Sequence, residues 1–160
     1  MPTTVRRSPG RLLLPGLLVL VTGCAGAPPA PEDPAVLEPC PDRPNCVVSR
    51  TDAGDAAVDP LPGAGDPLAS HRLLLAVLRA LPEARITADD GRRVTTVFRS
   101  PVLRFRDDVQ FLIRDDGTID VRSASRTGWW DLGANRRRVE TLRGLLEAKR
   151  ASGIPPGVGP

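Results

Sequence analysis

The sequence has few of the residues from which metal and cofactor sites are usually built. Its 160 residues include one histidine, His71, three cysteines and no tyrosine. A closed structural zinc site needs about four nitrogen or sulfur ligands. A Ser-His-Asp hydrolase usually shows a Gly-x-Ser-x-Gly turn, and this sequence has none. We therefore expect no metal and no cofactor, and the sequence favours a protein that is not an enzyme.

A hydrophobic run long enough to span a membrane is also missing. The apolar run over residues 12–21 is interrupted by Pro15 and is shorter than the about 18 residues of a spanning helix. Three arginines precede it, no acidic residue occurs before Glu32, and the run ends in Val21-Thr22-Gly23-Cys24. This order is typical of a secretory signal, and the four residues that end it resemble a lipobox. We expect residues 1–23 to be a lipoprotein signal peptide and Cys24 to carry the lipid; the alternative is an ordinary secretory signal with a chance cysteine.

A lipid on Cys24 would attach the protein to a membrane, which is therefore an expected partner. Two or more acyl chains hold a protein on a membrane stably. We expect a membrane-anchored lipoprotein of the cell envelope that faces the periplasm or the exterior. Ala25 after the cysteine resembles the sorting pattern for the outer membrane, which is the expected location in a diderm bacterium.

An excess of charge of one sign is missing once the signal is set aside. The signal holds three of the 22 basic residues and none of the 19 acidic residues, so the remainder is formally neutral. Net charge therefore gives no support for binding of nucleic acid.

Two cysteines remain after Cys24, and they lie close together at Cys40 and Cys46. Disulfides persist outside the cytoplasm, and a redox pair would more typically be spaced C-x-x-C. We expect a structural disulfide that contributes about 2–2.5 kcal/mol by the loop-entropy estimate.

The chain divides into an Ala/Pro-rich tether over residues 24–39, one domain over residues 40–150 and a disordered tail over residues 151–160. Asp66 and Pro67 predict the start of a helix that Pro82 ends, and Asn135 is expected to cap a second helix. Alternating apolar residues between the helices predict a meander of about four strands, which includes Phe105 and turns at Asp116-Gly117. The prediction is an α+β domain with two helices on one face of a small antiparallel sheet.

Three separated motifs resemble one known family. They are Cys40-Pro41 with Pro44-Asn45-Cys46-Val47, then Phe105-Arg106-Asp107-Asp108-Val109, then Arg122-Ser123-Ala124-Ser125-Arg126 running to Asp131-Leu132-Gly133, Asn135-Arg136 and Arg138. In this order they resemble the domain of unknown function DUF1499 over about residues 38 to 148. The resemblance implies a small domain of an envelope or organelle membrane and implies no activity.

The segment from Arg122 to Arg138 is where we expect the functional chemistry. Arginines at positions 136 to 138 fall in the first turn of the last helix, where a cation is unfavourable by about 0.3–1 kcal/mol unless an anion compensates. The anion could be internal, which makes the segment a set of ion pairs between sheet and helix, or it could be a ligand such as a lipid headgroup or another anionic small molecule. The candidate residues are Arg122, Ser123, Ser125, Arg126, Asp131, Asn135, Arg136, Arg138, Asp107 and Asp108. Asp107 and Asp108 are neighbours on a strand and should face opposite ways, so we do not expect them to act as a catalytic dyad.

Three classes of function remain open. The first is an envelope protein without catalytic activity that binds an anion, and the second is a hydrolase or transferase acting on a phosphorylated or glycan substrate. The third is a structural subunit of an envelope complex, of which an exposed apolar patch around Trp130 would be the sign. We expect at least one of Trp129 and Trp130 to fill the core, because the chain has few other aromatic residues.

Overall fold

The structure is a computed structural model that describes residues 35–100 and 104–153. The predicted signal peptide, Cys24, most of the predicted tether, Pro101 and residues 154–160 lie outside the described residues. No helix among the described residues is both long and apolar enough to cross a membrane.

Five strands form one antiparallel sheet in the order β1-β5-β4-β3-β2. They are β1 (Cys46–Val48), β2 (Ala84–Asp89), β3 (Arg93–Arg99), β4 (Arg106–Ile113) and β5 (Ile119–Ser125). The sequence predicted about four, and the fifth is the short edge strand β1, which pairs with β5. Phe105, predicted to lie in a strand, instead precedes β4 and is exposed.

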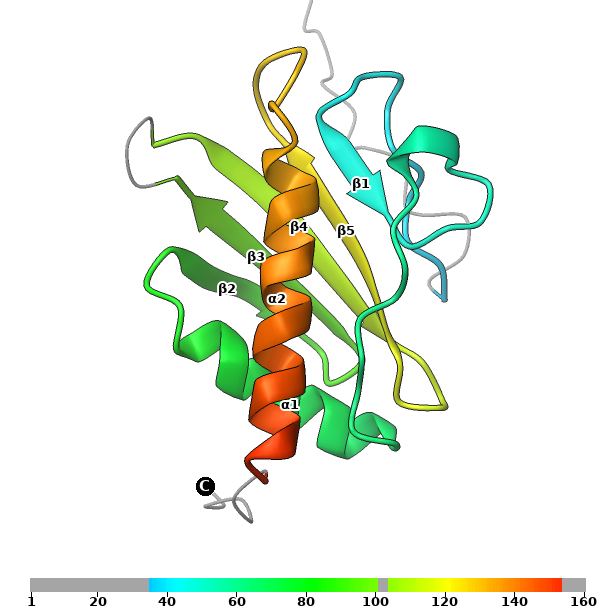
Figure 1. The fold of residues 1–160 in the computed structure, drawn as a ribbon, viewed down its shortest axis with the longest axis vertical. Helices are drawn as coiled ribbons and strands as arrows, with labels where there is room; N and C mark the ends of the chain where they lie inside the picture. The colour runs from blue at the N-terminus through cyan, green and yellow to red at the C-terminus, as the bar shows by residue number, and fades with distance from the viewer. Residues whose placement is uncertain (1–34, 101–103, 154–160) are drawn as a thin grey trace, which may run out of the picture. The chain divides into compact units, whose positions relative to one another are not determined.

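Two helices lie on the same face of the sheet (Figure 1). α1 (Pro67–Arg79) begins as predicted, because the side chain of Asp66 accepts a hydrogen bond from the backbone N–H of Ala69 at 2.9 Å. α2 (Ala134–Ala151) follows β5 and runs the length of the sheet. A short 3₁₀ turn, η1 (Gly54–Ala56), lies between β1 and α1. The predicted α+β class is confirmed, with both helices on one face of an antiparallel sheet.

The core lies between the helices and the sheet. Alternate residues of β3 and β4 are buried on this face, because side chains of a strand point to opposite sides in turn. Burial of each large apolar side chain stabilises the fold by about 1.5–3 kcal/mol. The fully buried large side chains are Phe111, Leu61, Leu73, Leu74, Leu78, Ile113, Ile119, Leu142, Leu146, Val48, Val94 and Val109.

A second, smaller cluster lies on the opposite face of the sheet. Leu37 is buried there against Val48 and Leu112. The guanidinium of Arg50 donates to the carbonyl of Leu37 at 3.1 Å, so the chain is held to the sheet before Cys40. The packed domain thus begins a few residues earlier than the disulfide.

Three segments lie together at one end of the sheet, which we call the loop end: residues 40–46, residues 99–100 with 104–106, and residues 126–133. Strand register places them together, because Arg99 pairs with Arg106, Asp107 with Ser125, and Ala124 with Cys46. The backbone N–H of Arg126 also bonds the carbonyl of Arg106 at 3.2 Å. The turns between β2 and β3 and between β4 and β5 lie at the opposite end of the sheet (Figure 1).

Candidate functional site

Asn135 is the centre of a buried polar network that joins β5, β1 and α2. Its side-chain amide is shared among the carbonyl of Asn45 at 2.8 Å, the hydroxyl of Ser125 at 3.0 Å and the carboxylate of Asp131 at 2.7 Å. Its side-chain oxygen accepts from the hydroxyl of Ser123 at 2.6 Å. Ser123 and Ser125 therefore face the same side of β5 and meet the same residue, and all of these groups are satisfied by partners within the protein.

Arg138 extends this network to β4. Its guanidinium donates to Asn135 Oδ1 at 2.6 Å and to Ser123 Oγ at 2.9 Å, and it forms an ion pair with the carboxylate of Asp107. The same guanidinium lies over the ring of Phe98, 5.1 Å from its centre. Arg138 is thus compensated by a carboxylate of the chain itself.

The start of α2 differs from the prediction, because Asn135 does not cap it. The helix begins at Ala134, after Gly133 in the left-handed conformation with φ of 78°. Asp131 serves the first turn instead: its carboxylate accepts from the backbone N–H of Gly133 and of Asn135, each at 2.8 Å. A negative side chain is favourable at this positive end of a helix. The anion beside the first amides of α2 is therefore a side chain of the protein.

Arg136 and Arg137 point away from the buried network. The guanidinium of Arg136 donates to the carbonyls of Asp55 at 2.6 Å and Ala57 at 3.0 Å, and that of Arg137 donates to the carbonyl of Leu132 at 2.8 Å. Within residues 35–100 and 104–153, no carboxylate forms an ion pair with Arg136. Carbonyl oxygens, rather than carboxylates, offset its position near the start of the helix.

Asp108, Arg126 and Arg122 lie outside the network as well. Asp108 points to the opposite face from Asp107, as predicted, and forms a two-bond ion pair with Arg126 at 2.7 and 2.9 Å. Hydrogen bonding to Asp108 raises the pKa of Arg126. Arg122 is on that same opposite face, where burial lowers its pKa although Glu38 and Asp108 raise it. These three residues are not part of one site with Asn135.

Two members of the network were not among the predicted site residues. Asn45 is buried, accepts from Asn135, and donates its own side-chain amide to the carbonyl of Gly128 at 2.6 Å. Phe98 contacts Arg138 through its ring face. The signal for Asn45 was its place in the Pro44-Asn45-Cys46 motif, whereas nothing in the local sequence pointed to Phe98.

The loop between β5 and α2 presents its apolar side chains to solvent. Trp129 is 67% exposed, Trp130 is 64% exposed and Leu132 is 64% exposed. The expectation that one tryptophan fills the core is wrong, because leucine, isoleucine and valine from both helices and the sheet already fill it. Leu132 also has φ of 56°, a conformation that side chains of L-residues rarely adopt.

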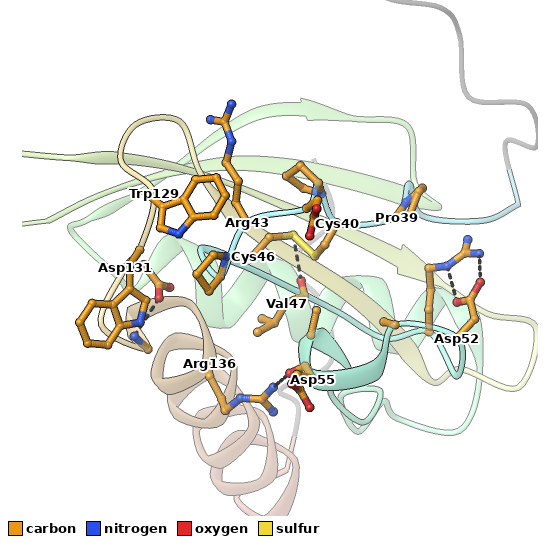
Figure 2. A pocket seen from close by; sticks show the side chains of 18 residues that line it. Pro39, Cys40, Arg43, Cys46, Val47, Asp52, Asp55, Trp129, Asp131 and Arg136 are labelled. Carbon is orange, nitrogen blue, oxygen red and sulfur yellow. Dashed lines mark hydrogen bonds and ion pairs between the residues drawn. A yellow bond between two sulfur atoms is a disulfide. The ribbon is translucent and has the colours of Figure 1, made fainter.

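An open groove of about 610 Å³ adjoins this loop. In Figure 2, Trp129 and Arg43 lie beside the disulfide between Cys40 and Cys46, which the sequence predicted. Elsewhere in the groove, the guanidinium of Arg136 is bonded to the backbone carbonyl of Asp55. The charged residues that line the groove are Arg43, Arg50, Arg136, Asp42, Asp52, Asp55 and Asp131. Arg50 and Asp52 pair with each other, and Asp131 is held by amides, so the groove offers an apolar rim with few free charges.

The described carboxyl groups do not form a metal or acid–base centre. Residues 35–100 and 104–153 contain no group of three or more His, Cys, Asp or Glu placed to hold a metal ion. Hydrogen bonding from Arg50 lowers the pKa of Asp52 in the groove, and a lowered pKa keeps this carboxyl group ionised at neutral pH.

The fold and this network define a class: a small α+β domain in which an asparagine and an arginine of the last helix are bonded to the sheet. The chain belongs to the family described as "Protein of unknown function (DUF1499)", whose profile matches residues 36–146. Comparison with curated proteins gave no match, and comparison with solved structures gave none either.

Proposed function

We propose that the chain is a lipid-anchored, non-catalytic binding protein of the cell envelope, attached through Cys24 and residing on the outer membrane where the cell has one. Its binding surface is the loop end, and its partner is anionic. The anionic partner does not bind at the first amides of α2, because the carboxylate of Asp131 already lies there.

The observation that carries this proposal is the exposure of Trp129, Trp130 and Leu132 on a loop whose backbone carbonyls are hydrogen-bonded to side chains of the domain. Asn45 bonds the carbonyl of Gly128, and Arg137 bonds the carbonyl of Leu132. Exposed apolar clusters mark interaction sites, and tryptophan is enriched at them; the same patch is the sign expected for a structural subunit of an envelope complex. A loop already ordered before binding loses less conformational entropy when a partner arrives.

The catalytic alternative lacks the features that would support it. A general acid at neutral pH needs a carboxyl group whose pKa is raised, usually by burial in a closed site. The shifted carboxyl groups in the described part of the chain, Asp52, Asp89, Asp90 and Asp116, all have lowered pKa values. The buried carboxylate near the network, Asp107, is neutralised by Arg138.

Attachment is tested by the substitution Cys24→Ser in the full-length chain. The wild type should sediment with membranes and resist extraction by high salt, whereas Cys24→Ser should lose the acyl groups and leave the membrane pellet. Retention of the unmodified wild-type thiol, detected by mass spectrometry of the mature chain, would overturn the lipid anchor.

Binding is tested with the mature chain carrying Cys24→Ser, so that no lipid carries it to the pellet. It should sediment with the isolated envelope fraction, and Trp130→Ser with Leu132→Ser should abolish sedimentation. The matched control is Leu68→Ser with Leu145→Ser, which removes two exposed apolar side chains from other surfaces. Equal sedimentation of both double variants, or no sedimentation of the parent chain, would overturn the binding function.

A further inference from the structure

We infer that the partner of the loop end is the surface of a membrane that contains anionic phospholipid, into which the exposed apolar side chains of Phe105 and of the β5–α2 loop enter while arginines contact the lipid phosphates. This inference rests on the proposed function for the location of the binding surface. It adds the chemical nature of the partner.

Exposed apolar side chains are concentrated at this end of the domain. Of the seven large apolar residues that are exposed in the described chain, four belong to the loop end: Phe105 at 52% and the three of the β5–α2 loop. Phe105 and the β5–α2 loop are neighbours, because Arg126 N–H bonds the carbonyl of Arg106. Tryptophan and phenylalanine place an apolar ring in the lipid boundary, and the indole N–H of tryptophan remains in the wet headgroup layer.

Charge is separated along the sheet. The three segments of the loop end contain five arginines and two aspartates, and Asp131 among them is engaged by helix amides. The turns at the opposite end, residues 89–92 and 114–118, contain four aspartates and two arginines. The arginines of the loop end are Arg43, Arg99, Arg104, Arg106 and Arg126, of which Arg126 forms an ion pair with Asp108 of β4. This separation orients the loop end toward an anionic surface.

The arrangement of these residues fits a lipid surface better than a protein partner. Protein interfaces gather aromatic residues in one core patch, where arginine is also enriched but charged residues are otherwise depleted. At Arg104, Phe105 and Arg106, apolar and arginine side chains instead alternate along one stretch of chain, and all three are exposed. Alternation of this kind suits the boundary where acyl chains meet phosphate groups.

The predicted tether is long enough for this contact. Val36 lies over the end of β3 remote from the loop end, because its carbonyl accepts from the side chain of Arg93 at 3.2 Å. Val36 is twelve residues after Cys24, and a Pro-rich chain reaches about 3.1 Å per residue, or about 37 Å. The seven residues of β3 span about 23 Å. A lipid at Cys24 therefore keeps the loop end within reach of the same membrane and raises its local concentration there.

The natural probe is tryptophan fluorescence, because Trp129 and Trp130 are the only tryptophans in the chain. The mature chain carrying Cys24→Ser is mixed with vesicles of phosphatidylcholine alone or of equal parts phosphatidylglycerol and phosphatidylcholine. Both kinds are also prepared with brominated acyl chains, which quench tryptophan on contact. We expect a shift of emission to shorter wavelength and quenching with the anionic vesicles, both lost in high salt.

Arginine variants keep the probe and test the charge. Arg104→Gln with Arg106→Gln should weaken binding to the anionic vesicles about fivefold for each charge removed. The control, Arg72→Gln with Arg92→Gln, removes two exposed arginines remote from the loop end; Arg92 pairs only with the highly exposed Asp115 there. The control should bind the anionic vesicles like the parent chain.

The inference would be overturned if no vesicle changes the emission, or if neutral and anionic vesicles quench it equally. It would also be overturned if the two pairs of arginine substitutions weaken binding to anionic vesicles equally. A full emission shift with soluble glycerol phosphate would also overturn it, because the partner would then be a headgroup and not a surface. Binding to the envelope fraction without binding to vesicles would reject the lipid surface and leave the proposed function standing.

Discussion

Arg138 on α2 and Asp107 on β4 form an ion pair in which only 14% and 6% of the respective side chains are exposed. Both charged groups are largely shielded from solvent, so each is stabilised by the other and by the surrounding hydrogen bonds. Asn135 Oδ1 and Ser123 Oγ accept hydrogen bonds from Nη1 of Arg138, and one carboxylate oxygen of Asp107 is buried without a hydrogen-bond partner. The link between helix and sheet at this point is therefore electrostatic as well as apolar.

Removal of one partner from this pair should be strongly destabilising. Arg138→Leu leaves Asp107 buried without a countercharge, and we expect the free energy of unfolding in urea to fall by about 3–5 kcal/mol. The double variant Arg138→Leu with Asp107→Leu should be more stable than Arg138→Leu alone, because no unpaired charge remains. The control is Arg126→Leu, whose pair with Asp108 is partly exposed and should be worth about 0–1 kcal/mol. Equal losses for Arg138→Leu and Arg126→Leu would contradict the buried pair.

The exposed tryptophans should contribute to binding and not to stability. Trp129→Ser with Trp130→Ser should change the free energy of unfolding by no more than about 0.5 kcal/mol, because surface substitutions rarely do more. Phe111→Ala, which empties a fully buried site, should lower it by about 3–5 kcal/mol. Thermal and urea unfolding of the three proteins check this. A large loss in the tryptophan variant would mean that the loop packs against the domain.

Gly63 and Gly144 should respond in opposite directions to the same substitution. A Cβ at Gly63 would lie 1.6 Å from the carbonyl oxygen of Gly117, so Gly63→Ala must displace backbone and should cost about 3 kcal/mol or more. A Cβ at Gly144, within α2, meets no atom within 4 Å, and alanine is the better helix former. Gly144→Ala should therefore stabilise the domain by about 0.5–1 kcal/mol. The melting temperatures of the two variants should lie on either side of that of the wild type.

The turn between β2 and β3 should lose stability in acid. Hydrogen bonds from the backbone N–H groups of Arg93 and Arg92 lower the pKa of Asp90 below its ordinary 3.8. A carboxyl group with a lowered folded-state pKa stabilises the fold above its unfolded pKa, and this stabilisation disappears as the pH falls through the folded-state pKa.

The variant Asp90→Asn keeps a side-chain oxygen acceptor but removes the titration. Its free energy of unfolding should depend less steeply on pH than that of the wild type below 3.8 and should approach the wild-type value at the lowest pH. Identical pH profiles would show that these amides do not bind the ionised form preferentially. Asp116→Asn is an informative second variant, since hydrogen bonds from Thr118 lower the pKa of Asp116 in the other turn of the same end.

Local patterns in the sequence predicted the elements of the fold well. Asp66 with Pro67 located the start of α1, and alternation of apolar residues located β3 and β4, because capping and strand alternation depend on neighbours in the chain. The spacing of Cys40 and Cys46 predicted their disulfide. The five-residue motifs around Asp107 and Ser123 identified the family.

The site could be predicted only in part. The sequence predicted that arginines, aspartates and serines of residues 107–138 interact in one region. It did not predict which residue each of them contacts. Asn135 was expected to cap α2, and in the structure Asp131 has that role while Asn135 turns toward β5 and Asn45. A side chain chooses its partner by distances across the sheet, and these distances are set by packing between distant segments.

The sequence by itself determined the class of fold, the disulfide and the family, because each depends on patterns within short stretches of chain. Only the tertiary structure decided that Arg138 pairs with Asp107 and that Arg136 bonds backbone carbonyls. It also decided that both tryptophans face solvent. The physical reason is that apolar side chains of both helices and of four strands already fill the core, so no volume remains for an indole ring.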